Sequence, residues 1–233
     1  MRRMLLVGLA LAVAACDREA APVEQVSEAA EELVSPAGEP TSLAAGDWAP
    51  RDECGDVAGA ANFRQILSAA VKARDVDVLV AIAADDIRLD FGGGAGKAEL
   101  RRRLEDPARD LWSELDEILA LGCAANGQGG ITLPWYFDQD LGTADPFTTW
   151  LVAGENVPVY AGPEADSRQL GTISWDMVEV ETIDPEAERQ KAELADGTTG
   201  YIPLDKLRSA VDYRLIGSSR NGRWRITSFV AGD

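Results

Sequence analysis

No histidine occurs among the 233 residues of this chain. Histidine is the usual general base near neutral pH, the commonest metal ligand and the usual pH-sensitive switch. Its absence excludes Ser-His-Asp and Cys-His catalysis. The composition therefore argues against the commonest enzyme mechanisms before any motif is considered.

Positive charge is scarce, since 22 Lys and Arg stand against 40 Asp and Glu and the formal net charge is −18. An acidic surface repels phosphate backbones, so we expect no nucleic-acid partner. A basic patch for anionic lipid headgroups is equally unsupported. The apolar fraction of 46% is ordinary for a globular protein, and the aromatic fraction of 6% is compatible with some polar linker.

Long hydrophobic runs are missing as well. The apolar run Met4–Ala12 is far shorter than the ~20 residues that a membrane-spanning helix needs. It follows the charged start Met1-Arg2-Arg3, and this order is typical of a secretory leader. The next residues, Val13-Ala14-Ala15-Cys16, resemble the lipobox of bacterial lipoproteins.

The resemblance to lipoproteins implies that residues 1–15 are a signal peptide and that Cys16 is diacylated and becomes the mature N-terminus. Several acyl chains anchor a protein durably, so the expected partner is a membrane of the bacterial envelope, with the protein facing the periplasm or the exterior. Removal of Arg2 and Arg3 would change the formal charge from −18 to −20. Asp17 resembles an inner-membrane retention signal of enteric bacteria, but the choice of membrane stays open. An ordinary secretory leader with an incidental cysteine is the alternative.

Residues 16–50 are rich in Glu, Ala and Pro and contain no aromatic residue before Trp48. Such a composition buries too little apolar surface to offset the entropy of ordering. We therefore expect a flexible, acidic tether here.

Residues 51–147 are expected to form an α+β domain, with a helical N-terminal segment and a small sheet. Apolar residues at helical spacing predict two helices, capped by Asn62 and by Asp75. Asp85-Asp86 then ends the second helix, and the alternation from Ile87 to Phe91 predicts a strand. The remaining expected elements are helices over 97–104 and 110–121, a turn at 127–130, and a strand over 131–137.

Residues 148–208 carry short alternating runs separated by Gly and Pro turns, which favour a small β-barrel. Three separated elements, Asn156–Pro163, Gly171-Thr172-Ile173 and Gly197–Ile202, resemble the bacterial SH3-type (SH3b) domain in order and spacing. The closing Leu of that family would be Leu204 or Leu207. The resemblance covers about a quarter of the chain and implies an SH3-like small β-barrel.

Residues 209–233 are predicted to form a hairpin about the Asn221-Gly222 turn. The preceding helix–helix–strand–helix order and the closing Gly222-Arg223-Trp224-Arg225-Ile226 strand resemble the nuclear-transport-factor-2-like α+β cone. The long middle strands of that cone are missing, and the SH3-like segment stands in their place. The hairpin is therefore expected to complete the sheet of the α+β domain.

Two loops imitate ligand motifs without their essential residues. Gly92–Lys97 lacks the first glycine of a phosphate loop, and Ala98 follows where a hydroxyl would bind magnesium. Asp138, Asp140 and Asp145 fail the spacing of a calcium loop, because Gly142 occupies the third ligand position. We therefore expect no cofactor and no metal.

Two cysteines, Cys54 and Cys123, remain once Cys16 is acylated. An even pair in an exported protein favours a disulfide between them, and two buried thiols are the alternative.

The candidate ligand-binding residues are the aromatics Tyr160, Trp175 and Tyr201, with Trp150 nearby. In modules of the SH3b family, aromatic faces and acidic loops bind peptides, including those of the cell wall. The alternative is that these rings only complete the barrel core. One departure from the family weakens the prediction of a ligand groove: by this resemblance Arg189 stands where the family usually has a tryptophan. A polar loop over 182–188 precedes it.

These observations favour a non-catalytic, membrane-anchored envelope lipoprotein whose SH3-like module binds a peptide, peptidoglycan or a partner protein. One alternative is an enzyme that uses a cone-type pocket, with Asp85, Asp86 or Asp90 as its carboxylate. That mechanism needs a buried carboxyl group with a raised pKa. A structural spacer is the third possibility.

Overall fold

The computed structural model describes residues 46–232. Cys16, the predicted signal peptide and most of the predicted tether lie outside the described residues. Inside them, four α-helices and two β-sheets establish a mixed α+β class.

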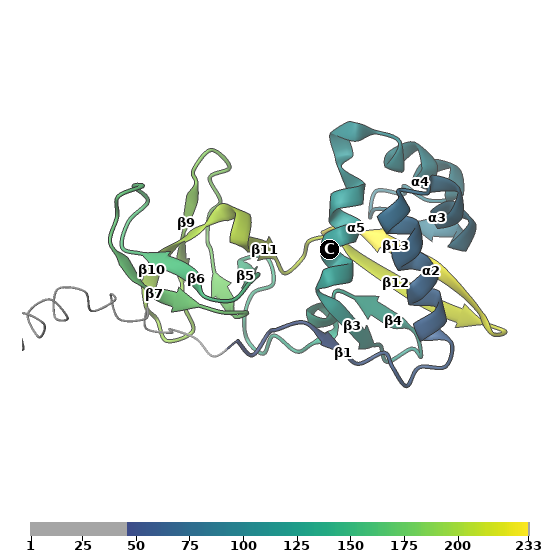
Figure 1. The fold of residues 1–233 in the computed structure, drawn as a ribbon, viewed down its shortest axis with the longest axis horizontal. Coiled ribbons are helices and arrows are strands. Elements are labelled where there is room, and N and C mark those ends of the chain that lie inside the picture. The colour runs from purple at the N-terminus through teal and green to yellow at the C-terminus, as the bar shows by residue number, and fades with distance from the viewer. Residues whose placement is uncertain (1–45, 233) are drawn as a thin grey trace, which may run out of the picture. The chain divides into compact units, whose positions relative to one another are not determined.

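The four α-helices all lie in the N-terminal half of the described chain (Figure 1). They are α2 (Ala60–Ala73), α3 (Val76–Ile82), α4 (Lys97–Leu104) and α5 (Leu111–Ala120). Three short 3-10 helices are η1 (Pro107–Arg109), η2 (Trp135–Asp138) and η3 (Leu204–Lys206).

The first sheet joins strands from both ends of the described chain in the order β1-β3-β4-β12-β13-β2. Its strands are β1 (Arg51–Asp52), β2 (Ala83–Arg88), β3 (Gly122–Ala125), β4 (Ile131–Leu133), β12 (Arg214–Arg220) and β13 (Arg223–Val230). Strands β12 and β13 form the predicted C-terminal hairpin, and they pair with β4 and β2. The hairpin therefore completes this sheet, as the sequence predicted.

The helices cover one face of this sheet, and their apolar sides make a single core with it (Figure 1). Phe63 of α2 stacks on Trp224 of β13 with ring centroids 5.5 Å apart. Leu67 and Ile118 are fully buried between α2, α5 and the strands. Burial of such side chains stabilises a fold by about 1.5–3 kcal/mol each.

One of the two predicted helix caps is wrong. Asp75 caps α3, since its carboxylate accepts a hydrogen bond from Val78 N at 3.0 Å. Asn62 instead lies inside α2, and Gly59, with φ of 79°, occupies the N-cap position. Trp224 Nε1 lies against Gly59 and donates to Ala58 O, so tertiary packing sets this start.

The predicted strand over 87–91 is shifted. Strand β2 begins at Ala83, so Asp85 and Asp86 lie in a strand and do not end a helix. It ends at Arg88, and Phe91 is 48% exposed where alternation predicted burial. The glycine loop folds back, with Leu89 N donating to Gly94 O, and this turn carries Phe91 outward.

The strand predicted over 131–137 ends at Leu133, because Pro134 has no N–H for a ladder and η2 follows it. Strands β1 and β3 were not predicted. The last predicted tether residues also belong to the fold, since Trp48 packs against Trp135 at 6.0 Å and Trp48 N donates to Trp175 O. Trp48 is the first aromatic residue after the acidic segment, and it gives this part of the chain apolar surface to bury.

The second sheet has the order β11-β5-β8-β9-β10-β6-β7. Its strands are β5 (Thr149–Val152), β6 (Val157–Tyr160), β7 (Gln169–Ile173), β8 (Met177–Glu179), β9 (Arg189–Glu193), β10 (Thr199–Pro203) and β11 (Leu207–Ser209). Strands β11 and β7 are its two edges. The pairing of these strands therefore does not close the barrel that the sequence predicted.

The glycine-containing signature at 197–202 has a packing reason in this sheet. A Cβ at Gly200 would lie 2.3 Å from Val159 Cγ1, so only glycine lets β10 approach β6 this closely. Gly197 has φ of 82° in the turn between β9 and β10. Asp196 stabilises that turn by accepting a hydrogen bond from Thr198 N at 2.8 Å.

Candidate functional site

The outer face of β6, β10 and β9 carries two of the candidate aromatic residues, Tyr160 and Tyr201. Side chains alternate along these strands, so Val159, Ile202 and Ala192 point into the core while their neighbours point outward. Tyr201 is the Cα partner of both Tyr160 and Lys191. Directly paired residues share a face of the sheet, so three strands together present one outer surface.

The structure brings two of the three predicted ligand residues together and separates the third. Tyr160 and Tyr201 are half-buried neighbours on the outer face. Trp175 packs instead with Leu121 and Trp135, in a cluster that joins this sheet to the α+β part. Trp150 packs against the core of the second sheet. Trp175 and Trp150 are therefore not part of one aromatic surface with the tyrosines.

A groove of about 680 Å³ opens beside Tyr160. Its walls come from the loop before β9, from the ends of β9 and β10, and from η3. The lining residues are Tyr160, Pro185, Glu186, Ala187, Glu188, Arg189, Pro203, Leu204 and Asp205. The groove is open to solvent and places apolar surface beside four charged side chains, a combination that can bind a ligand with both kinds of group.

A buried glutamine holds the loop that forms one wall of the groove. Gln190 is 2% exposed. Its Oε1 accepts from Asp184 N at 2.9 Å, and its Nε2 donates to Asp184 O at 2.7 Å and to Ala187 O at 3.1 Å. Leu204 N of η3 also donates to Glu188 O at 2.9 Å. These bonds fix the loop against η3, so the groove is preformed.

Arg189, the first residue of β9, lies beside Tyr160. Its guanidinium lies 3.5 Å from the centroid of the Tyr160 ring. The same group donates to Glu164 O and Ala165 O of the loop between β6 and β7. The planar cation thus stacks on the ring much as an aromatic side chain would.

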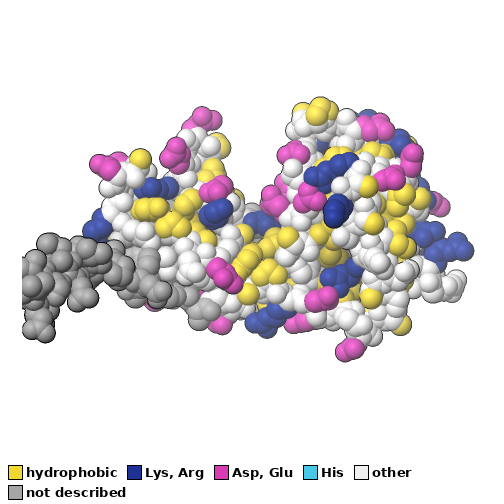
Figure 2. Space-filling view, in the orientation of Figure 1, with side chains coloured by type: hydrophobic (Ala, Val, Ile, Leu, Met, Phe, Trp, Pro, Cys, Tyr) yellow, Lys and Arg dark blue, Asp and Glu magenta, His cyan; other side chains and the backbone are white. Residues whose placement is uncertain are grey.

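Acidic side chains surround the groove. Glu186 and Glu188 are exposed and make no ion pair with any residue of 46–232. Asp205 pairs with the neighbouring Lys206, at 3.1 Å. Acidic side chains also stand at the tips of the loops over this sheet in Figure 2. The groove therefore has an apolar floor and an acidic rim.

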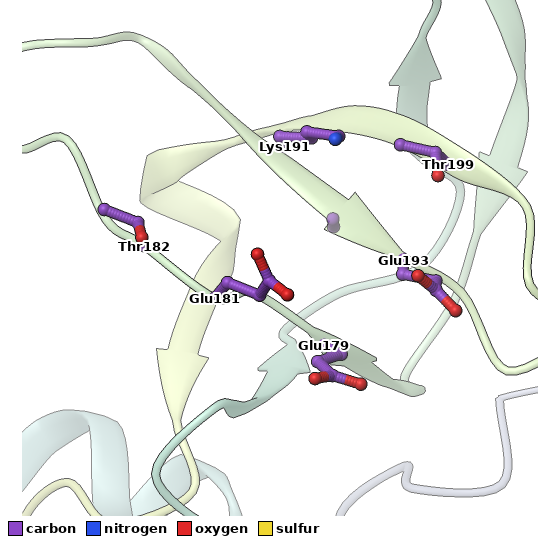
Figure 3. Close-up of a pocket in the computed structure, with 7 residues that line it drawn as sticks. Glu179, Glu181, Thr182, Lys191, Glu193 and Thr199 are labelled. Carbon is purple, nitrogen blue, oxygen red and sulfur yellow. The ribbon is translucent and has the colours of Figure 1, made fainter.

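A second, smaller hollow of about 220 Å³ lies further along β9. Figure 3 shows the carboxylates of Glu179, Glu181 and Glu193 gathered on one side, with Lys191 across from them. Glu179 and Glu193 are direct partners on β8 and β9. No group of acidic, Cys or His side chains within residues 46–232 is arranged to hold a metal ion.

The three carboxylates considered for catalysis do not have the properties that a general acid needs. Asp85 is 95% exposed and pairs with Lys97 at 2.8 Å, which lowers its pKa. Asp86 is exposed. Arg103 and then Gly94 N hydrogen-bond Asp90 and lower its pKa as well. Carboxyl groups with lowered pKa values stay ionised at neutral pH and do not donate protons.

Cys54 and Cys123 form a disulfide in the structure, which is the pairing expected from the sequence. Cys54 follows β1 and Cys123 lies in β3, and both are fully buried. The disulfide therefore links the segment after β1 to β3, and neither cysteine lines the groove.

Of the three predicted ligand residues, Tyr160 lines the groove, whereas Tyr201 lies on the same outer face but is not among the residues that line it. The composition of residues 182–188 predicts only a polar loop, and the sequence gives no functional signal at Pro203. Leu204 was noted as a closing residue of the SH3b pattern, which was the available signal for η3.

None of the helices within residues 46–232 combines the length and apolarity of a membrane-spanning helix. No protein-family model matches the chain, and neither a characterised protein nor a solved structure is significantly similar to it. The geometry of the groove and the sequence motifs are therefore what any functional proposal has to rest on.

Proposed function

We propose that this protein is a non-catalytic, lipid-anchored lipoprotein of the bacterial envelope whose second sheet is an SH3-like module that binds a peptide-like ligand. The ligand is a peptide of the cell wall or a segment of an envelope protein. The observation that carries the proposal is the preformed groove beside Tyr160, with its apolar floor and acidic rim.

The strand order supports the SH3-like part of the proposal. Strands β5, β8, β9 and β10 pair in chain order, the last strand β11 returns beside β5, and the β6–β7 hairpin pairs with β10. Such a strongly wrapped antiparallel sheet places loops from distant parts of the chain around one groove. The η3 turn between β10 and β11 completes the groove wall.

The groove predicts a measurable loss of binding. We expect Tyr160→Ala to reduce capture of isolated cell-wall sacculi or envelope proteins by full-length, detergent-solubilised protein by about tenfold, since an aromatic anchor at a binding surface contributes on the order of 1.4 kcal/mol or more. The matched control is Phe147→Ala, because Phe147 is 59% exposed and does not line the groove. Circular dichroism checks that both variants are folded. Equal capture by Tyr160→Ala and the wild type would favour a spacer and reject the groove.

The lipobox predicts a second outcome. Cys16→Ser removes the only thiol that the predicted lipoprotein pathway would acylate, so the protein should move from the membrane fraction to the soluble fraction. Mass spectrometry of the membrane-bound wild type should show a lipidated N-terminal Cys16. A wild-type protein that lacks acyl chains, or a Cys16→Ser protein that stays in the membrane fraction, contradicts lipid anchoring.

A further inference from the structure

We infer that the groove beside Tyr160 takes an extended protein segment in which an apolar residue stands next to lysine or arginine. The inference rests on the proposed function and specifies the class of its ligand. The inference depends on which charged side chains around the groove already have partners within the protein.

Some carboxylates of the acidic rim have no basic partner among residues 46–232. Glu186 and Glu188 lie two residues apart and have no basic partner in the described part of the chain. Asp205, on the η3 side, is 72% exposed in its side chain and pairs with Lys206. A ligand cation placed between the loop and η3 would meet carboxylates on both sides.

The one basic side chain that lines the groove is already engaged. Arg189 stacks on Tyr160 and donates to two backbone carbonyls, so its position is fixed by neutral groups. A ligand carboxylate that approached Arg189 would also approach Glu186 and Glu188, which line the same groove. With three carboxylates against one guanidinium, the groove repels anions and attracts cations.

The floor of the groove offers apolar surface. Its neutral lining residues are Tyr160, Pro185, Ala187, Pro203 and Leu204. The remaining lining residues are charged and form the rim. Proline, leucine and tyrosine surfaces bury the apolar side chains and long methylene stems of a peptide.

The net charge of the chain strengthens the same preference at longer range. A formal charge of −18 raises the rate at which cationic segments encounter the surface and lowers it for anionic ones. Such steering depends on ionic strength, because salt screens charges beyond about 8–10 Å.

The test uses fluorescein-labelled acetyl-Lys-Leu-Lys-Pro-Leu-Arg-amide as the probe and a twin in which Gln replaces each basic residue. Fluorescence anisotropy with the full-length protein in detergent gives both affinities. We expect the basic peptide to bind about tenfold more tightly than its twin and to weaken as salt rises from ~0.05 to ~0.3 M.

Two double variants with the same charge change separate recognition by the groove from general acidity. Glu186→Gln with Glu188→Gln should lower the affinity for the basic peptide about tenfold, because it removes the charge-assisted contacts of the rim. Glu179→Gln with Glu193→Gln, in the other hollow of Figure 3, should change it less than about twofold.

Three outcomes overturn the inference: equal binding of the two peptides, equal losses in the two double variants, or no binding of the basic peptide at ~1 mM, which corresponds to about −4 kcal/mol. If capture of sacculi still depends on Tyr160 in any of these cases, the proposed function stands and the ligand is a cell-wall peptide. If Tyr160→Ala changes nothing in either assay, the proposed function itself fails.

Discussion

Replacing both Cys54 and Cys123 with alanine is expected to lower the free energy of unfolding by about 4 kcal/mol, the entropic value for a disulfide that closes a loop of this length. The two cysteines are 69 residues apart in the chain. The loop contains all four helices of the described chain, so the unfolded state gains most of its new freedom in the α+β part.

Loss of the disulfide should also release the short strand β1 from the sheet. Strand β1 has only two residues, and it pairs in parallel with β3 through Arg51 with Gly122 and Asp52 with Cys123. Glu53 N also donates to Cys123 O at 2.8 Å. So short a strand has little pairing of its own, and we expect it to detach first when the covalent bond is absent.

Urea denaturation with and without a thiol reductant measures this effect. The reduced wild type should match the double alanine variant, and the variant should not respond to the reductant. The alanines avoid a buried hydroxyl group without a partner, so the comparison isolates the bond. Two free thiols in the unreduced wild type, or equal unfolding midpoints in all samples, would refute the prediction.

The second large effect is expected at Arg208. Its side chain is 5% exposed, and it reaches from β11 to Glu117 and Glu114 of α5, the latter at 3.3 Å. It also pairs with Asp212 at 3.5 Å and donates to Tyr213 O at 3.3 Å. One guanidinium therefore pairs with three carboxylates, of which Glu114 and Glu117 belong to α5.

We expect Arg208→Met to cost about 2–4 kcal/mol. Removing one partner from a buried ion pair costs roughly 3–5 kcal/mol, and here the carboxylates keep part of their hydration, which reduces the loss. Methionine keeps the apolar stem, so the loss reports the charge more than the packing. The unfolding midpoint in urea measures the change, and Arg102→Met is the control, because Arg102 is 58% exposed and pairs with Glu99 on the surface.

The pH dependence of the Arg208→Met defect has a defined sign. Burial, and then the charge of Asp212, raise the pKa of Glu114. The folded state therefore binds this proton more tightly than the unfolded state, and ionisation of Glu114 opposes folding as the pH rises. Without Arg208, ionised Glu114 destabilises the folded state more strongly. The loss of unfolding free energy in Arg208→Met should therefore become smaller as the pH falls and Glu114 becomes protonated.

Glu114→Gln should for the same reason be much milder than Arg208→Met at neutral pH. It removes a carboxylate whose ionisation is already unfavourable, while Glu117 and Asp212 remain to pair with Arg208. An equal loss for the two variants, or an Arg208→Met defect that is independent of pH, would show that the cluster acts through packing alone.

Local signals predicted local structure well. The helix over 97–104 begins and ends where apolar spacing placed it, and Asp75 caps α3. Both features depend on interactions within a few residues, which a sequence displays directly. The prediction at Asn62 failed because a distant residue, Trp224, packs at the start of α2. The prediction at Phe91 failed because the Gly94 loop folds back on Leu89, a turn that hydrophobic alternation does not reveal.

By itself, the sequence determined the lack of histidine chemistry, the acidic charge, the helices, the cysteine pair and the short strands of the second sheet. Only the tertiary structure decided that Tyr160, Tyr201 and Arg189 share one surface while Trp175 does not. The physical reason is strand register: a shift of one residue would turn each of these side chains to the opposite face. Contacts between β6, β9 and β10 set that register, and these strands are separated by loops whose path no local pattern specifies.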